Sequence, residues 1–231
     1  MSCAIRRRLS IAVRYDGGDQ HGHSTLTTYL GARLNSRHTW LLTAWRQVLV
    51  EAGGHIPDRN VERLLRCTHI PVPPRDNRRL DLIVPGLNIA HGLPLFCDVT
   101  IVSPISGNGA PRPGTSNRGG KLLQTAETIN NHTYNDVIAS GLGSLQCLGC
   151  EVYGRWGPQS VALVPALARE RCRNLPARIR RGTTMGLLHR WWGILGTALQ
   201  RAVAHTILYE YADLPTTNLE PTCPLDELEV V

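Results

Sequence analysis

Two short apolar runs, each preceded directly by an aspartate, constrain the fold of this chain more than any other feature. Residues 82–84 follow Asp81, residues 99–102 follow Asp98, and turns rich in Pro and Gly separate the two runs. Each run has the length and the β-branched content of a buried strand. A buried charge is costly unless it is paired or coordinates a metal. The pattern therefore predicts two strands whose leading aspartates hold a divalent metal.

Helical periodicity accounts for most of the remaining chain. In residues 36–52, apolar side chains recur at helical spacing, with Ser36 as a candidate N-cap and Gly53-Gly54 as the stop. Further helices are expected at residues 121–138, 161–173 and 185–211, and a further strand at residues 142–152. These elements predict an α/β fold in which helices flank a small mixed β-sheet, with a helical C-terminal part.

The domain organisation follows from the same pattern. The chain has 231 residues, of which 42% are hydrophobic, and this supports one substantial core. We expect a loosely structured arm over residues 1–36, one domain over residues 37–211, and a disordered acidic tail over residues 212–231. Residues 61–65 are compatible with a short helix or an edge strand, and Glu62 within them with either a site carboxylate or a surface residue.

Arginine dominates the charge of the chain. The formal net charge is +7, and Lys121 is the only lysine. Arginine binds phosphate through bidentate hydrogen bonds, so a nucleic acid is the first partner to consider, although an ordinary basic surface fits the charge equally well. The candidate phosphate-binding residues are Arg112 and Arg118, in a Gly/Pro-rich loop that could also be a disordered insert, and Arg178, Arg180 and Arg181, between the last two helices.

Cysteine usage and hydropathy bound the location of the protein. The seven cysteines are scattered and odd in number, which is typical of reduced thiols in an intracellular protein. The pair Cys147 and Cys150 lacks the second pair that a zinc site needs, so buried thiols explain it better. No apolar run reaches the length of a membrane span, and we expect no membrane partner.

Two carboxylates on adjacent strands can share a Mg²⁺ or Mn²⁺ ion, because these ions bind oxygen ligands and retain water and phosphate in their coordination shell. Such an ion activates water and stabilises the charge of a phosphodiester during cleavage. Aspartates at strand ends also occur in α/β proteins without a metal. The spacing of Asp81 and Asp98 is thus compatible with both readings.

The order helix, edge strand, two Asp-led strands, helix and strand resembles the PD-(D/E)xK nuclease superfamily. The passages RRLDLIVPG, LPLFCDVTIVSP and AETINNHTY are most similar to the restriction-enzyme-like endonuclease domain of non-LTR retrotransposons and to reverse-transcriptase-derived proteins, over roughly residues 37–210. The resemblance implies a restriction-endonuclease-like core, a Mg²⁺ or Mn²⁺ cofactor held by Asp81 and Asp98, a DNA or RNA partner, and a nuclear location.

The sequence departs from that family at the catalytic lysine. Thr100 stands where the motif has lysine, and in the retrotransposon group the lysine moves to the next helix, shortly before a tyrosine; here Asn130-Asn131 precede Tyr134. Asparagine cannot supply a positive charge. The zinc knuckle that precedes this domain in the retroelements has also lost its cysteines. The candidate catalytic residues are Asp81, Asp98, Glu62 as an auxiliary acid, Lys121 as the replacement cation, and Asn131 at the lysine position.

Three functions remain open at this stage. The first is an active Mg²⁺-dependent DNA endonuclease, which the two aspartates favour. The second is a catalytically inactive nuclease fold that binds nucleic acid through its arginines, which the missing lysine favours. The third is a transposon-derived reading frame without activity. The variant Asp98→Ala tests the first function, because an active enzyme would lose its cleavage of DNA when this carboxylate is removed.

Overall fold

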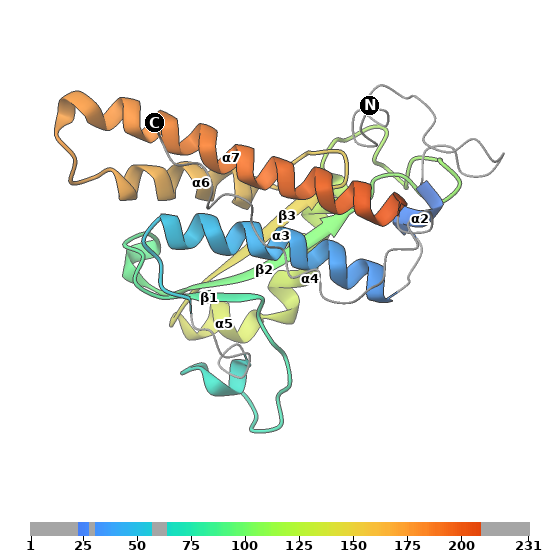
Figure 1. Ribbon diagram of the computed structural model, residues 1–231. Helices are drawn as coiled ribbons and strands as arrows, with labels where there is room; N and C mark the ends of the chain where they lie inside the picture. The colour runs from blue at the N-terminus through green and yellow to red at the C-terminus, as the bar shows by residue number, and fades with distance from the viewer. Residues whose placement is uncertain (1–22, 28–30, 57–63, 209–231) are drawn as a thin grey trace.

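The computed structural model describes residues 23–27, 31–56 and 64–208, and these residues contain one three-stranded sheet (Figure 1). Its strands are β1 (Leu82–Val84), β2 (Leu95–Val102) and β3 (Ser144–Glu151), in the order β1-β2-β3. β1 pairs antiparallel with β2, and β3 pairs parallel with β2. The expected small mixed sheet of an α/β protein is therefore confirmed.

Helices cover both faces of this sheet, as Figure 1 shows. On one face lie α3 (Gly31–Glu51), α6 (Pro158–Arg171) and α7 (Ala177–Leu208). The other face carries α4 (Lys121–Thr133) and α5 (Asn135–Ser140), which connect β2 to β3. The short elements are α2 (His23–Thr27) and the 3₁₀ turns η2 (Leu65–Cys67) and η3 (Ala90–Gly92). The face of α4 that carries Leu123 and Asn130 is buried, and Asn130 contacts Asp98 of β2.

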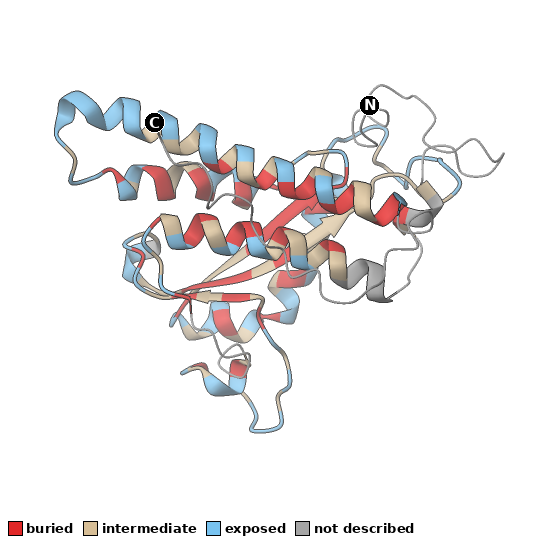
Figure 2. Cartoon of the chain, viewed as in Figure 1, coloured by how far each residue is buried: buried red, intermediate tan, exposed pale blue. Residues whose placement is uncertain are grey.

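The larger core lies between the sheet and the α3, α6 and α7 layer, where Figure 2 shows buried positions on the facing sides of each element. Trp45 of α3 is fully buried, and its ring meets that of Trp156 edge-on at 6.1 Å between centroids. Trp156 in turn contacts Trp192 of α7 at 5.4 Å. Aromatic pairs of this kind each add about 0.5–1.5 kcal/mol beyond the area they bury. The tryptophans therefore belong to the core rather than to a binding surface.

Glu51, at the end of α3, fixes α7 against α3. Its carboxylate accepts hydrogen bonds from Arg190 Nη2 at 2.7 Å, Arg190 Nε at 3.0 Å and Trp191 Nε1 at 2.8 Å. Burial favours the protonated form of Glu51, but the donors Arg190 and Trp191 outweigh that effect and hold the pKa below its usual value. This carboxylate is accordingly structural.

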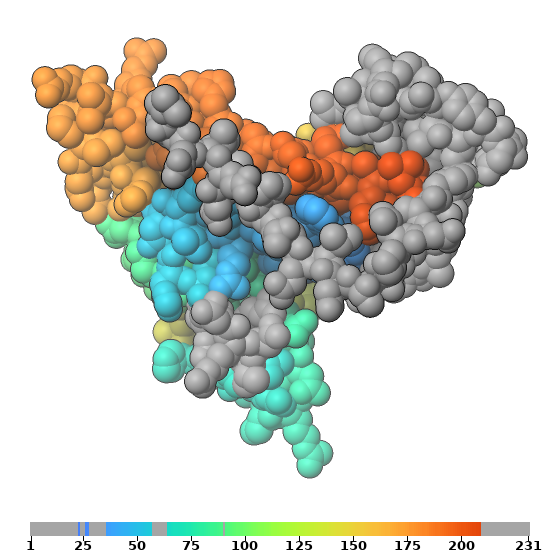
Figure 3. All heavy atoms as spheres, viewed as in Figure 1, coloured from blue at the N-terminus to red at the C-terminus, as the bar shows by residue number. Residues whose placement is uncertain are grey.

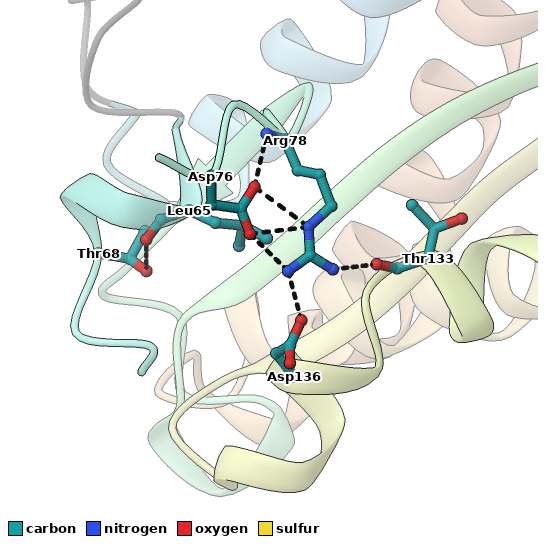
Figure 4. A network of polar contacts seen from close by, with 6 residues as sticks. All are labelled: Leu65, Thr68, Asp76, Arg78, Thr133 and Asp136. Atoms are coloured by element: carbon teal, nitrogen blue, oxygen red, sulfur yellow. Dashed lines mark hydrogen bonds and ion pairs between the residues drawn. The ribbon is translucent and has the colours of Figure 1, made fainter. Parts of the chain in front are cut away.

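Arg78 fixes the segment before β1 to the opposite layer (Figure 4). Its guanidinium donates to Asp76 Oδ2, at 2.9 Å from Nε and 2.6 Å from Nη2, and also to Asp136 of α5 and to the carbonyl of Thr133. Asp81 follows only three residues later and directly precedes β1. The position of Asp81 is therefore tied to the junction of α4 and α5.

Several boundaries differ from the sequence-based expectation. α3 begins at Gly31, so the last residues of the expected arm are helical, and Leu26 of α2 is buried in the core. The helix expected at residues 121–138 is interrupted at Tyr134, whose backbone (φ −110°, ψ 33°) ends α4. The last helix begins at Ala177, directly after Pro176, because proline is well accommodated at a helix start and Ala and Arg are strong helix formers.

The described cysteines are free, and those at positions 97, 147, 150 and 172 are buried. The structure thus agrees with the reading of Cys147 and Cys150 as buried thiols. Within the described ranges, no helix is both long enough and apolar enough to cross a membrane.

Candidate functional site

The structure brings Asp81 and Asp98 together at the point where β1 begins. The register pairs Leu82 with Cys97, which leaves Asp81 opposite Asp98. Regular pairing stops there: the Asp81 backbone N–H donates to the Cys97 carbonyl at 3.1 Å, and Asp81 Oδ2 accepts from the Val99 backbone N–H at 2.7 Å. The Asp81 carboxylate therefore occupies the edge of β2 beside Asp98.

Asp98 does not lead its strand, as the sequence suggested, because β2 begins earlier, at Leu95. Residues alternate between the two faces of a strand, so Asp98 shares with Thr100 the face that is turned toward α4. Asp98 Oδ2 accepts hydrogen bonds from Thr100 Oγ1 at 3.1 Å and from Asn130 Nδ2 at 2.8 Å. The carboxylate is thus held in one orientation within the sheet rather than at its end.

The electrostatic environment of Asp98 favours a cation. Burial raises the pKa of Asp98 to about 6, and the negative charge of Asp81 adds to the rise. The hydrogen bonds from Thr100 and Asn130 and the charge of His38 act in the opposite direction without cancelling it. A positive ion between the two carboxylates would remove their repulsion, so the metal-free pair is poised to accept one.

His38 of α3 joins this pair. Its Nε2 lies 2.9 Å from Asp81 Oδ2, and this hydrogen bond is the main reason that the pKa of His38 is raised. The sequence pattern did not identify His38 as a site residue. The sequence feature that could have identified His38 is its position on the buried face of α3. It precedes Leu41 by three residues and Trp45 by seven.

Asn130, and not the expected Asn131, reaches the aspartates. Successive residues of an α-helix point about 100° apart, so only one of the two asparagines can face β2. The side chain of Asn130 is 4% exposed, and its Oδ1 is buried without a hydrogen-bond partner in the structure, whereas Asn131 is half-buried. The sequence feature that could have identified Asn130 is its spacing. It is a polar residue seven positions after Leu123, on the same buried face of the helix.

Two other candidate catalytic residues are not brought to the pair. Lys121, at the start of α4, is exposed and nine residues before Asn130, which corresponds to about 13 Å along the helix axis. Its side chain lies against Gly114 of the preceding loop. Glu62 lies outside the described residues. Within the described part of the chain, no three His, Cys, Asp or Glu side chains are arranged to hold a metal ion. Any metal here would therefore be held by fewer than three such side chains, with other oxygen ligands or water completing its coordination.

The candidate phosphate-binding arginines belong to two segments that lie at opposite ends of the molecule in Figure 1. The first turns of α7, in orange, project from one end in Figure 3. Arg178, Arg180 and Arg181 lie in the first turns of α7, which project beyond α3, and every residue from 177 to 183 is exposed (Figure 2). All 32 residues of α7 lack an acidic side chain. We call residues 177–183 the arginine arm. Arg180 also donates to the Leu175 carbonyl at 2.8 Å, which stabilises the start of the helix.

The second group, Arg112 and Arg118, lies in the loop between β2 and α4. This loop contains hydrogen-bonded turns: the Ser106 backbone N–H donates to the Ala110 carbonyl at 2.8 Å, and that of Arg112 to the Pro104 carbonyl at 2.9 Å. Both arginine side chains are exposed. The loop therefore presents its arginines from a folded frame.

No family model, curated protein or solved structure matches the chain. The functional argument consequently rests on the residues of the site and on the arginine-rich surfaces.

Proposed function

We propose that the chain is a nuclease domain of retrotransposon origin in which Asp81 and Asp98 hold a Mg²⁺ or Mn²⁺ ion and cleave phosphodiester bonds in DNA. The observation that carries the proposal is the pairing of these two carboxylates. They face each other across the edge of β2, and burial, with the charge of Asp81 as the second cause, raises the pKa of Asp98 to about 6. His38 contacts Asp81, whereas Asp98 stays buried with a raised pKa, and a perturbed carboxyl of this kind is typical of a functional site.

The donor set fits a hard ion. The side chains that meet at the pair offer carboxylate oxygens from Asp81 and Asp98 and an amide oxygen from Asn130, and oxygen ligands suit Mg²⁺ and Mn²⁺. Mg²⁺ is commonly held by only one or two carboxylates together with water and substrate phosphate. Two aspartates are therefore enough, even though no cluster of three acidic, histidine or cysteine ligands occurs in the described residues.

The chain topology supports the nuclease part of the proposal. The antiparallel pair β1–β2 followed by a helical crossover to the parallel strand β3 is the arrangement that a restriction-endonuclease-like core requires around its two acidic residues. An isolated antiparallel bridge between Leu64 and Arg79 precedes β1, where that core would have a further strand. We therefore propose a restriction-endonuclease-like core for this chain.

Each residue around the pair has a distinct role in this proposal. The bound ion would supply Lewis acidity and an activated water molecule. His38 holds the Asp81 carboxylate through Nε2, and Thr100 and Asn130 orient Asp98 through Oδ2. The arginine arm and the exposed Arg112 and Arg118 bind the phosphate backbone outside the reacting centre. These arginines suit a polyanionic partner such as DNA. A DNA partner in turn suits a nuclear location.

One observation favours the second candidate, an inactive nuclease fold that binds nucleic acid. The family's lysine position carries the neutral Asn131, and the adjacent Asn130 that reaches Asp98 is also neutral. Lys121 lies about 13 Å from Asn130 along α4. Of the described side chains, His38 is the cationic group that contacts the pair, and it does so through Asp81. The arginines would bind nucleic acid equally well in an active and in an inactive domain. A cleavage assay therefore distinguishes the two candidate functions.

The test is nicking of supercoiled plasmid by the purified chain in Mg²⁺, with EDTA as the metal-free reference. Wild-type protein and the control Glu170→Gln, which changes a carboxylate of α6 remote from the pair, should nick the plasmid. Asp98→Ala should not, while keeping its helical circular dichroism. Salt-sensitive DNA binding without nicking by any of the three would support the inactive fold, and equal nicking by Asp98→Ala would reject the proposed site.

A further inference from the structure

We propose that Asn130 is a third protein ligand of the metal ion and coordinates it through Oδ1. This inference rests on the proposed function, because it assumes the ion held by Asp81 and Asp98. It departs from the family pattern, which places a lysine in this part of the helix. Asn130 would add a neutral oxygen ligand where that pattern adds a positive charge.

The buried amide oxygen of Asn130 is the observation that points to a ligand. The side chain is 4% exposed, and Oδ1 is inaccessible to solvent and without a hydrogen-bond partner. Buried polar atoms in folded proteins are nearly always hydrogen-bonded, because an unsatisfied acceptor loses its hydration without compensation. An atom of this kind beside two carboxylates requires a donor or a cation, and a divalent ion satisfies all three groups together.

The orientation of the amide is fixed by its other atom. Nδ2 donates to Asp98 Oδ2 at 2.8 Å. Exchanging the two ends would place Oδ1 against the Asp98 oxygen, acceptor against acceptor, so the ionised carboxylate holds the amide in the observed orientation. Asn130 therefore presents an oxygen that is fixed relative to Asp98 by a direct hydrogen bond.

The end of α4 is anchored on both sides, which fixes the Asn130 backbone as well. The Tyr134 backbone N–H donates to the Asn130 carbonyl at 2.9 Å, and the Tyr134 hydroxyl donates to the carbonyl of Arg79 at 2.9 Å. Arg79 lies two residues before Asp81. Tyr134 thus connects the residue that offers the amide oxygen to the segment that carries the first carboxylate. A preformed set of oxygen ligands is consistent with this rigidity.

Other polar groups near the amide are poorer ligands for a hard ion. Cys147, which pairs with Asp98 across β2 and β3, is a buried free thiol, and sulfur favours softer metals. Thr100 already donates its hydroxyl to Asp98 Oδ2. The Tyr134 hydroxyl also lies near Asp98 but donates to the Arg79 carbonyl. Asn130 Oδ1 is therefore the oxygen without a hydrogen-bond partner.

The experiment is calorimetric titration of the intact metal-free chain with Mn²⁺ at pH 7. We expect Asn130→Ala to weaken Mn²⁺ binding by about tenfold or more, and Asn130→Asp, which keeps an oxygen at this position and adds charge, to bind at least as tightly as wild type. Asn131→Ala is the matched control on the adjacent, half-buried position and should be unchanged. Thermal unfolding of each metal-free variant shows whether it is folded.

The variant Asn130→Asp separates a metal ligand from a residue that only orients Asp98. Asn130, like Thr100, donates a hydrogen bond to Asp98 Oδ2. If Asn130 only oriented Asp98, Asn130→Asp would weaken binding, because it removes the donor and adds a repelling charge. That result, or wild-type affinity in folded Asn130→Ala, overturns the inference and leaves the proposed function standing. Absence of Mn²⁺ binding by the wild-type chain overturns both.

Discussion

The carboxylate of Asp81 accepts a hydrogen bond from the backbone N–H of Val99, 2.7 Å away, directly after Asp98 in β2. Asp81 thus replaces the backbone acceptor that a longer β1 would have supplied to β2. The bond fixes one acidic side chain on the strand that carries the other. Separating the two carboxylates would break this hydrogen bond, so their repulsion is retained in the folded state.

The metal-free protein should lose stability as the pH rises from about 4 to about 6. The folded state holds the pKa of Asp98 at about 6, above its usual value of 3.8, because the carboxylate is buried beside Asp81. The folded state then binds the proton more tightly than the unfolded state, so this contribution is full below pH 4 and is lost as the pH rises through 6. The expected loss is about 2–3 kcal/mol in the free energy of unfolding, from about 1.4 kcal/mol per tenfold change in proton affinity. Urea unfolding at a series of pH values in EDTA measures it.

Asp98→Asn is the matched variant for that experiment. It removes the ionisable group but keeps the size of the side chain, so the fall in stability between pH 4 and 6 should largely disappear. An identical pH profile in the variant would contradict the assignment of the raised pKa to Asp98.

The imidazole of His38 should titrate above its usual value of 6.5, because it donates a hydrogen bond to Asp81 and faces two carboxylates. Its contribution to stability is present below pH 6.5 and is lost as the pH rises through the raised pKa. NMR titration of the histidine ring protons measures the pKa, with exposed His189 as the internal reference. Asp81→Asn should return the pKa of His38 toward 6.5. A His38 titration curve unaffected by that change would exclude the hydrogen bond.

The sequence was sufficient to predict the sheet and the two aspartates of the candidate site. Strand periodicity identified β1 directly, and helical periodicity identified α3, because both patterns reflect which side chains are buried locally. It misplaced Asp98 at the start of β2, because a carboxylate interrupts the apolar run that begins at Leu95, and only the pairing with β3 shows that the strand continues through it. Strand length depends on such nonlocal partners, which a periodicity cannot show.

The residues around the carboxylates were harder to find for the same reason. His38 and Asn130 lie 43 and 32 residues away from the aspartates that they contact. Each is a polar residue on an otherwise buried helix face, and such a residue indicates that a partner exists without indicating which one. Choosing between Asn130 and Asn131 required knowing how α4 is rotated against β2. The arginine arm, by contrast, was located by composition alone, although it begins α7 instead of preceding it.

Removing the charges of the arginine arm should weaken nucleic-acid binding in a salt-dependent manner. The triple variant Arg178→Ala, Arg180→Ala, Arg181→Ala removes three exposed charges from a helix start without acidic neighbours on α7. If each arginine contacts one phosphate, the slope of log K against log salt should fall by about 2–3. Fluorescence anisotropy with a labelled duplex at several salt concentrations measures that slope.

A control of equal charge is available for this measurement. Arg66, Arg75 and Arg201 are exposed and lie outside the arm, Arg201 near the opposite end of α7, so their triple substitution by Ala changes the net charge by the same amount. It should alter the slope much less. Equal slopes in the two triple variants would show that binding depends on net charge and not on the arm.

Arg78→Ala should destabilise the fold by about 1–2 kcal/mol, because it removes charge-assisted hydrogen bonds to Asp76 and Asp136 from a partly exposed network. The hydrogen bonds from Arg78 also hold the pKa of Asp76 below its usual value, so this stabilisation should be lost as the pH falls through that lowered pKa. Asn77→Ala, on the exposed neighbouring residue, is the control. Thermal unfolding at pH 7 distinguishes them, and equal melting temperatures would show that the network around Arg78 contributes no stability.

The most direct test of the account is titration of the metal-free chain with Mn²⁺ at pH 7, comparing wild type with Asp81→Asn and Asp98→Asn. Both variants keep the shape of the side chain and remove one of the two converging charges. The account predicts that wild type binds one ion per chain and that each variant loses this binding. Binding of equal affinity and stoichiometry in all three proteins would contradict a metal site at Asp81 and Asp98.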